Sequence, residues 1–285
     1  MGAQVIYGKE VSASIHERMH QELLVLQEKT GTAPGLAVVL VGEDPSTLAH
    51  VLAKGKTGRH PGFRLQLVEL AARAAEEDLR EAVAELNVDD AVHGILVQMP
   101  LPPQLNAWEV LRAVSPEKDV SGLHPLNVGN LMNGSKSYLP WAAYACMVML
   151  DYISCDPAGK HVVVIGDSGI VGKPLSLLML RRHATVTVCR PETPDLQAIC
   201  READVLLAAE GPDGLVTGEL VKPGAVVIDV GERTADGKVR EIAAADSVCR
   251  QASRFFPAPG GVQSLSGTMV LLNTLEACKR KYRVR

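Results

Sequence analysis

The sequence predicts a two-domain α/β protein in which parallel strands alternate with helices. The chain has 285 residues, which is enough for two domains of ordinary size. Its hydrophobic fraction is 47%, but aromatic residues make up only 4%, so Val, Leu, Ile and Ala must build the core. Such a core suits parallel sheets covered by helices. Segments with strand-like and helical patterns also alternate along most of the chain.

The first half of the chain begins this alternation. Apolar residues from Val11 to Leu26 recur at helical spacing, and "PGLAVVLVG" is a buried apolar run that Gly42 ends. The expected elements are a helix over 10–30, a strand over 34–42, a helix over 44–58 capped by Asp44 or Ser46, a strand over 64–70, a helix over 76–87 and a strand over 92–102 that enters a proline-rich loop. These elements predict a βαβ layer.

A second sheet is expected after a long loop over 116–127 and an apolar helix over 142–153. Its four Val-rich strands are "HVVVIG" (161–166), "ATVTVC" (184–189), "DVLLAA" (204–209) and "GAVVIDVG" (224–231). A final helix over 267–282 is expected to pack back on the first unit. We therefore divide the chain into a first domain of residues 1–141 with 267–285 and a second of residues 142–266.

Composition excludes several classes of function. A net charge of −4 and a pI near 6.1 do not indicate nucleic-acid binding, and the basic tail "KRKYRVR", the one exception, is expected to be a solvated chain end. The six cysteines have neither zinc-ligand spacing nor the pattern of a disulfide framework, so we expect no metal site. There is no signal-peptide core and no apolar run of about 18 residues. We expect a soluble, cytoplasmic protein without a membrane partner.

The segment "VVVIGDSGIVGKPLS" resembles a dinucleotide-binding turn. Gly166 ends a buried strand, and Gly169 and Gly172 follow before a helix. Glycines there permit a tight turn and a close approach to a pyrophosphate at the helix N-terminus. The spacing is GxxGxxG rather than GxGxxG, so a turn that needs glycine only for its geometry stays open. The candidate cofactor-binding residues are Gly166, Asp167, Ser168, Gly169, Ile170, Gly172 and Arg190.

Two charged residues give opposite indications of which dinucleotide binds. Arg190 follows the second strand of this domain, where NADP-dependent enzymes place a cation for the 2′-phosphate. Asp167 puts a negative charge inside the glycine loop. Arg190 favours NADP, and NAD remains open.

Several segments together resemble one family. They are "PGLAVVLVGEDPS", "KGK", "GILVQMPLP", "PEKDVSGLHPLNVGNL", "VVVIGDSGIVGKPLS" and "PAPGGV" followed by "NTLEA", in that order. The chain is similar to the bifunctional methylenetetrahydrofolate dehydrogenase/cyclohydrolase (FolD-like) family over nearly its whole length. The resemblance implies a homodimer with a folate domain and a Rossmann-like NAD(P)-binding domain. It also implies oxidation of 5,10-methylenetetrahydrofolate and hydrolysis of the methenyl product to 10-formyltetrahydrofolate.

The resemblance also assigns residues. Its motif lysine matches Lys54, and the glutamine of "VQMPLP" matches Gln98. A lysine shielded from water can have a lowered pKa and can move protons, and a glutamine can orient it without adding charge. Lys56 is expected to be solvated. The residues that the resemblance places on the substrate side are His50, Asp119, Ser121, Pro259, Gly260 and Gly261.

The departures from the family pattern gather on the folate side. His50 replaces a tyrosine that stacks on the folate, and it lies four residues before Lys54, on one face of the expected helix. Ser121 replaces the carboxylate that the resemblance assigns to the pterin. The sequence "QSLS" replaces "GPMT" after "PGGV". A further departure falls in the second domain, where Asp167 replaces an arginine or small residue.

Three hypotheses follow. The first is the ordinary bifunctional, NADP-dependent folate enzyme, which we prefer. The second is a diverged relative that acts on a related small molecule or keeps one activity, which Ser121 and Gln263 favour. The third is a non-catalytic binding homologue, which Asp167 favours and Lys54 opposes.

Overall fold

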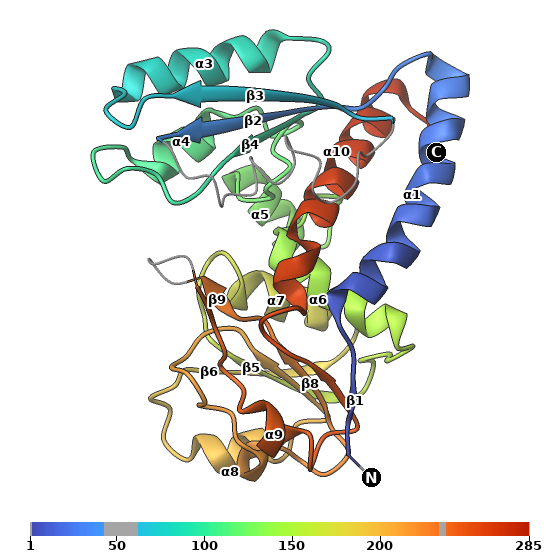
Figure 1. The fold of residues 1–285 in the computed structure, drawn as a ribbon, viewed down its shortest axis with the longest axis vertical. Coiled ribbons are helices and arrows are strands. Elements are labelled where there is room, and N and C mark those ends of the chain that lie inside the picture. The colour runs from blue at the N-terminus through green and yellow to red at the C-terminus, as the bar shows by residue number, and fades with distance from the viewer. Residues whose placement is uncertain (1, 43–61, 234–237, 285) are drawn as a thin grey trace. The chain divides into compact units, whose positions relative to one another are not determined.

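The computed structural model describes residues 2–42, 62–233 and 238–284. The chain divides into two compact units (Figure 1). Residues Met1–Ser14 and Pro140–Ser266 form one unit, and residues Ile15–Leu139 and Gly267–Arg285 form the other. We name them the six-stranded unit and the three-stranded unit after their main sheets.

The three-stranded unit is built on a parallel sheet in the order β3-β2-β4. Its central strand is β2 (Gly35–Val41), flanked by β3 (Arg64–Leu70) and β4 (Gly94–Val97). Every residue of β2 is buried, which explains its unbroken apolar sequence. The strand β3 lies at the edge and is largely exposed, so its sequence alternates with polar residues.

Helices cover both faces of this sheet. On one face, α3 (Glu76–Val88) and α4 (Ala107–Ala113) form a core with alternate residues of β2 and β4. Helix α10 (Ser266–Tyr282) approaches β4 so closely that a side-chain carbon on Gly94 would lie 2.9 Å from the Thr274 hydroxyl. The Asn273 amide donates to the carbonyl oxygens of Val120 and Leu139, at 2.9 Å each. The chain's last helix therefore belongs to the core of this unit.

Helices α1 and α5 also contribute to this unit. Helix α1 (Gly8–Thr30) begins in the six-stranded unit and continues into this one, where Glu22 pairs with Lys279 of α10 at 2.8 Å. Helix α5 (Pro125–Met132) starts inside the segment predicted as a loop, because His124 accepts a hydrogen bond from the Leu126 amide and Pro125 occupies the first turn.

The six-stranded unit contains a parallel sheet in the order β1-β11-β8-β7-β5-β6. The strands are β1 (Gln4–Val5), β5 (His161–Ile165), β6 (Thr185–Cys189), β7 (Val205–Ala208), β8 (Val226–Asp229) and β11 (Arg254–Phe256). The strands β7 and β8 are wholly buried, which accounts for their Val, Leu and Ile content. Parallel order places the carboxyl ends of β5, β6, β7 and β8 at one edge.

Helices and a short hairpin complete this unit. They are α6 (Trp141–Tyr152), α7 (Gly172–Arg181), α8 (Leu196–Cys200), α9 (Ala245–Val248), the 3-10 turns η1 (Gly218–Leu220) and η2 (Val262–Leu265), and the antiparallel pair β9 (Glu232–Arg233) and β10 (Val239–Arg240). Helix α7 packs on β5, β6 and α6. The β5–loop–α7 connection is therefore a parallel-sheet crossover with its turn at the carboxyl edge.

The predicted α/β fold class is confirmed, with one difference in the assignment of the N-terminus. We expected residues 1–141 to belong to one domain, but Gln4 and Val5 pair in parallel with Arg254 and Phe255. Backbone hydrogen bonding to β11 therefore holds Met1–Ser14 in the six-stranded unit. Two residues are too few for strand periodicity, so the sequence carried no signal for β1.

Candidate active site

The glycine loop joins β5 to α7 as a tight turn. Gly166 has a φ of +114° and its amide donates to the Cys189 carbonyl at 2.8 Å. Helix α7 starts at Gly172, where a side-chain carbon would lie 2.2 Å from the Gly166 carbonyl oxygen. The first glycine is thus needed for its backbone conformation and the last for close packing of the turn.

Hydrogen bonds hold the middle of this loop. The Ser168 amide donates to Glu210 Oε1 at 3.0 Å, and the Ser168 hydroxyl accepts from the Val171 amide at 3.2 Å. Glu210 comes two residues after β7, so the neighbouring strand end braces the loop. Gly169 and Ile170 remain exposed at its tip, directly before the positive end of α7.

Asp167 and Arg190 form an ion pair beside this turn. Ile165 and Cys189 are register partners, so the residues that follow β5 and β6 emerge side by side. Arg190 Nη2 lies 2.6 Å from Asp167 Oδ2, and 67% of the arginine side chain is exposed. This hydrogen bond lowers the pKa of Asp167 and raises the pKa of Arg190. All seven residues predicted to bind the cofactor thus lie on two adjacent strand ends and the loop between β5 and α7.

Asp119 is the centre of a buried hydrogen-bond network. It is 1% exposed, and its carboxylate accepts from the Ser121 hydroxyl, from the His124 amide at 2.8 Å and from the Asn127 amide group at 2.9 Å. Its backbone forms a parallel bridge with Ile95 of β4. Both carboxylate oxygens therefore accept hydrogen bonds from the segment that leads into α5.

The Ser121 hydroxyl is oriented by that network. Ser121 is 7% exposed and donates its proton to Asp119, so its oxygen keeps lone pairs for another donor. Asn127 secures the opposite side of Asp119 by also donating to the Pro116 carbonyl at 2.9 Å. The structure thus brings Asp119 and Ser121 together as a positioned pair.

Gln98 follows β4, and only the nitrogen of its side-chain amide has a hydrogen-bond partner among the described residues. Its backbone amide donates to the Val39 carbonyl at 2.9 Å, and its Nε2 donates to the Met99 carbonyl at 2.6 Å. Its Oε1 is buried and has no hydrogen-bond partner among the residues that the structure describes. A buried acceptor of this kind needs a donor. The two residues predicted to lie near it, His50 and Lys54, fall outside the described residues.

The loop Pro259–Gly261 is tied to its surroundings through backbone and side-chain bonds. The Gly260 carbonyl accepts from the Gly8 amide at 2.8 Å, and the Ser264 hydroxyl donates to the Gly261 carbonyl at 2.7 Å. Gln263 donates to the Gly231 carbonyl, directly after β8, at 3.0 Å. Of the two residues that depart from the family pattern, Ser264 therefore stabilises this loop through the loop's own backbone, and Gln263 bonds to the segment that follows β8.

Asp229 ends β8 and is fully buried. Its carboxylate accepts from the amides of Gly231 at 3.0 Å and Ala243 at 2.8 Å. Burial nevertheless dominates and raises the pKa of Asp229 to about 7. Its geometry is that of a residue that fixes two loops.

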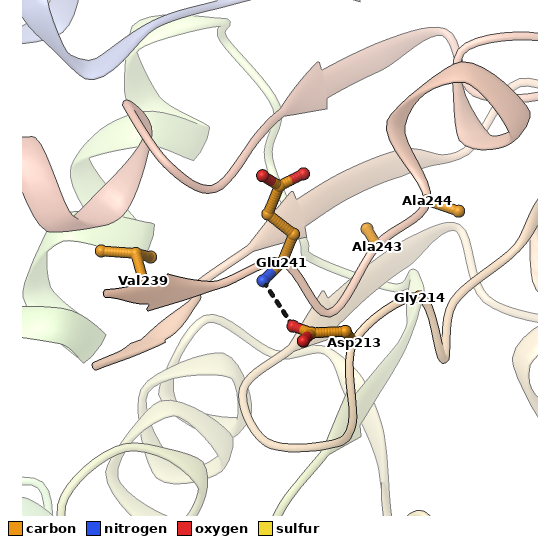
Figure 2. A pocket seen from close by; sticks show the side chains of 6 residues that line it. All are labelled: Asp213, Gly214, Val239, Glu241, Ala243 and Ala244. Atoms are coloured by element: carbon orange, nitrogen blue, oxygen red, sulfur yellow. Dashed lines mark hydrogen bonds between the residues drawn. The ribbon is translucent and has the colours of Figure 1, made fainter. Parts of the chain in front are cut away.

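A pocket of about 320 Å³ lies elsewhere in the six-stranded unit (Figure 2). Its lining residues are Asp213, Gly214, Val239, Glu241, Ala243 and Ala244. Asp213 accepts a hydrogen bond from the Glu241 amide at 3.1 Å, while the Glu241 carboxylate points away from Asp213. None of the predicted site residues lines it, so this pocket is separate from the glycine loop.

Comparison with known proteins decides the family. Residues 6–121 match the model of the tetrahydrofolate dehydrogenase/cyclohydrolase catalytic domain, and residues 140–282 match the model of the NAD(P)-binding domain of the same family. The chain belongs to the tetrahydrofolate dehydrogenase/cyclohydrolase family. A relative from Geobacillus thermodenitrificans, named bifunctional protein FolD, is 46% identical over 281 residues, which cover 98% of this chain and 99% of that protein. Bifunctional protein FolD 2 of Geobacter metallireducens is 47% identical over 97% of each chain.

Solved structures of the tetrahydrofolate dehydrogenase/cyclohydrolase family share the fold. The FolD enzyme of Campylobacter jejuni superimposes with a TM-score of 0.90 at 36% identity, covering 98% of this chain and 99% of that one. The FolD of Trypanosoma brucei, solved with NADP cofactor and an inhibitor, has a TM-score of 0.90 at 35% identity over 99% of each chain. Sequence similarity and structural similarity to this family therefore both extend over nearly the full length of the chain.

Sequence reasoning missed two residues that shape the site of this family member. Glu210 contacts the glycine loop from the end of β7, and Asn127 holds Asp119 from α5. Glu210 follows a buried strand at the carboxyl edge, and that position was the available signal. Asn127 carried none, because its partner lies in a loop whose path the sequence did not define.

Proposed function

We propose that this chain oxidises 5,10-methylenetetrahydrofolate with NADP and hydrolyses 5,10-methenyltetrahydrofolate to 10-formyltetrahydrofolate. The observation that carries this proposal is 46% identity to a bifunctional FolD protein over 98% of the chain. The two family domains, catalytic and NAD(P)-binding, support both halves of the activity. We assign the folate to residues 15–139 with 267–285 and the dinucleotide to residues 140–266.

On the folate side, Lys54 is the proton-transferring group and Gln98 its positioning partner. The buried Gln98 Oε1 lacks a donor among the described residues, while its Nε2 is fixed by the Met99 carbonyl. An ammonium or amine on Lys54 would supply that donor. A lysine held by a neutral amide keeps the freedom to give and take a proton at its Nζ, which the hydrolysis requires.

The same side recognises the pterin through Ser121. Its hydroxyl proton is committed to Asp119, so its oxygen accepts from the N–H groups of the aminopyrimidine ring. Asp119 thereby acts as a positioning residue behind Ser121 rather than as a direct contact. We assign His50 to stacking against the substrate.

On the dinucleotide side, the turn from Gly166 to Gly172 and the N-terminus of α7 receive the pyrophosphate. Asp167, Ser168, Gly169 and Ile170 border it, and Arg190 faces the 2′-phosphate. The residues fit this group because the turn leaves no room for a side chain at Gly172 and presents exposed backbone at Gly169 and Ile170. When bound, NADP accepts the hydride of the oxidation.

We further propose a cytoplasmic homodimer that binds neither nucleic acid nor metal. None of the helices in the described part of the chain is long and apolar enough to cross a membrane. Sedimentation equilibrium of the purified protein measures the oligomeric state, and a monomer at micromolar concentration would contradict the homodimer.

The catalytic assignment is tested with variants of two neighbouring lysines. Lys54→Met is expected to lower the rate of methenyl hydrolysis at least about a hundredfold, since general acid–base groups contribute 10²–10⁴-fold. Lys56→Met, two residues away, removes the same charge and is expected to leave the rates within about twofold. Equal losses in the two variants, or no loss in Lys54→Met, would overturn the role of Lys54. Gln98→Ala is expected to lower the rate less than Lys54→Met and to shift its pH profile.

A further inference from the structure

The Asp167–Arg190 ion pair joins the glycine loop to the end of β6, the position at which dinucleotide-binding folds distinguish NADP from NAD. The strands β5 and β6 are adjacent, and the Gly166 amide is bonded to the carbonyl of Cys189, the residue before Arg190. In dinucleotide-binding folds of this type, the end of the second strand meets the 2′ position of the adenosine ribose. Arg190 therefore occupies the position that distinguishes a 2′-phosphate from a 2′-hydroxyl.

Asp167 already uses part of the Arg190 guanidinium. Its Oδ2 lies 2.6 Å from Arg190 Nη2, and only 32% of the aspartate side chain is exposed, against 67% of the arginine. The arginine is therefore the more exposed partner of the pair. Glu192 and Glu210 add negative charge near Arg190, and Lys173 adds positive charge near Asp167. A 2′-phosphate that reaches Arg190 must share it with the Asp167 carboxylate.

We propose that Asp167 is a specificity-determining residue, which weakens the preference for the 2′-phosphorylated dinucleotide and lets this chain use NAD as well as NADP. The inference rests on the proposed function, because it concerns the cofactor of that reaction. The Asp167 carboxylate repels the 2′-phosphate and competes with it for Arg190. Because it lies beside Arg190, the same carboxylate would accept a hydrogen bond from the 2′-hydroxyl of NAD, the bond that an acidic residue at the end of the second strand makes in NAD-specific sites.

Binding of nucleotide fragments separates this effect from catalysis. The probes are adenosine 2′,5′-bisphosphate and 5′-AMP, titrated calorimetrically into wild type, Asp167→Asn and Asp167→Ser. We expect both variants to raise the affinity ratio of bisphosphate to monophosphate about fivefold, the effect of removing one charge near about 4 Å in water. Arg190→Gln is expected to lower the ratio at least about fivefold, and Asp167→Asn/Arg190→Gln to show a higher ratio than Arg190→Gln, because the Asp167 carboxylate also repels the 2′-phosphate directly.

Glu192→Gln is the matched control. It removes one negative charge from the same surface without a direct bond to Arg190, and we expect the ratio to change less than about twofold. A ratio that stays constant or falls in Asp167→Asn and Asp167→Ser would overturn the inference, since a fall would mean that Asp167 holds Arg190 in place for the phosphate. Thermal melting of each variant verifies that it is folded.

The kinetic readout distinguishes this inference from the proposed function. We expect wild type to oxidise 5,10-methylenetetrahydrofolate with either dinucleotide, and Asp167→Asn to shift the ratio of kcat/KM values toward NADP by the factor seen in binding. Absence of oxidation with both dinucleotides contradicts the proposed function, while the fragment ratios still test Asp167. Oxidation with an unchanged ratio contradicts the inference alone.

Discussion

Replacing Asp119 by alanine tests whether this carboxylate holds the substrate loop together. Asp119 is 1% exposed, and three donors converge on it: the Ser121 hydroxyl, the His124 amide and the Asn127 side chain. Asp119→Ala leaves all three without their acceptor. The loop that precedes α5 would then lose its only carboxylate-centred network among the residues that the structure describes.

The magnitude follows from the number and kind of bonds lost. A hydrogen bond to a charged group contributes about 1.5–3 kcal/mol, and contributions within one network do not add fully. Asp119→Ala also leaves three neutral donors in the buried loop without an acceptor, and each unpaired buried group costs about 1–3 kcal/mol. We therefore expect the free energy of unfolding of the three-stranded unit to fall by about 4 kcal/mol.

Urea denaturation followed by Trp108 fluorescence measures this change. Trp108 lies in α4 of the three-stranded unit, whereas Trp141 lies in α6 of the six-stranded unit. A Trp141→Phe background therefore restricts the signal to the unit that contains Asp119. The matched control is Glu117→Ala, which removes an exposed carboxylate from the same loop and is expected to change the free energy by less than about 0.5 kcal/mol.

A small effect would refute this reasoning. If Asp119→Ala destabilises the unit by less than about 1 kcal/mol, the carboxylate is free to contact substrate directly and Asp119 is not a positioning residue. Ser121→Ala separates the two roles further. It is expected to raise the KM for the folate substrate while lowering the free energy of unfolding by only about 1–2 kcal/mol, since it removes a single bond.

Three further predictions concern buried groups and the glycine turn. Burial raises the pKa of Asp229 from 3.8 to about 7, so the folded protein keeps a proton that the unfolded chain loses. The free energy of unfolding is therefore expected to fall by up to about 4 kcal/mol as the pH rises from 4 to 7. Denaturant titrations at several pH values measure this slope, and Asp229→Asn is expected to remove it. Burial lowers the pKa of His93 from 6.5 to about 4, which has the opposite sign: stability falls by up to about 3 kcal/mol as pH drops from 6.5 to 4, and His93→Gln abolishes this component. Gly172→Ala is expected to lower both the melting temperature and the affinity for NADP, because its methyl group would lie 2.2 Å from the Gly166 carbonyl oxygen. The control is Gly169→Ala, whose methyl group would meet nothing within 4 Å, so it is expected to lower the affinity but not the melting temperature. Equal melting temperatures for the two variants would contradict the packing argument.

The long and strongly patterned elements could be predicted from the sequence. The expected strand over 64–70 is β3, and the helix expected over 267–282 is α10 within one residue. The buried strand expected within 224–231 is β8. These elements depend on local periodicity and on apolar runs, and both are visible in the sequence.

The remaining features depend on contacts between distant segments. The strands β1 and β11 are two and three residues long, and they exist because β11 pairs with β8 and β1 pairs with β11. Arg190 and Asp167 were each recognised, but their pairing follows from the β5–β6 register. The Asp119 network likewise needs the path of the loop to α5, which the sequence did not define. The site assignments of His50, Lys54 and Gln98 stay predictions.

The central claim is that one chain carries out both folate reactions. Purified protein mixed with 5,10-methylenetetrahydrofolate and NADP⁺ is followed by the absorbance of the methenyl product, and then supplied with 5,10-methenyltetrahydrofolate alone. The account predicts that the absorbance forms in the first reaction and decays in the second faster than without enzyme, with the enzymatic decay lost in Lys54→Met and kept in Lys56→Met. No methenyl signal at high enzyme concentration, together with no folate binding by calorimetry, would contradict it.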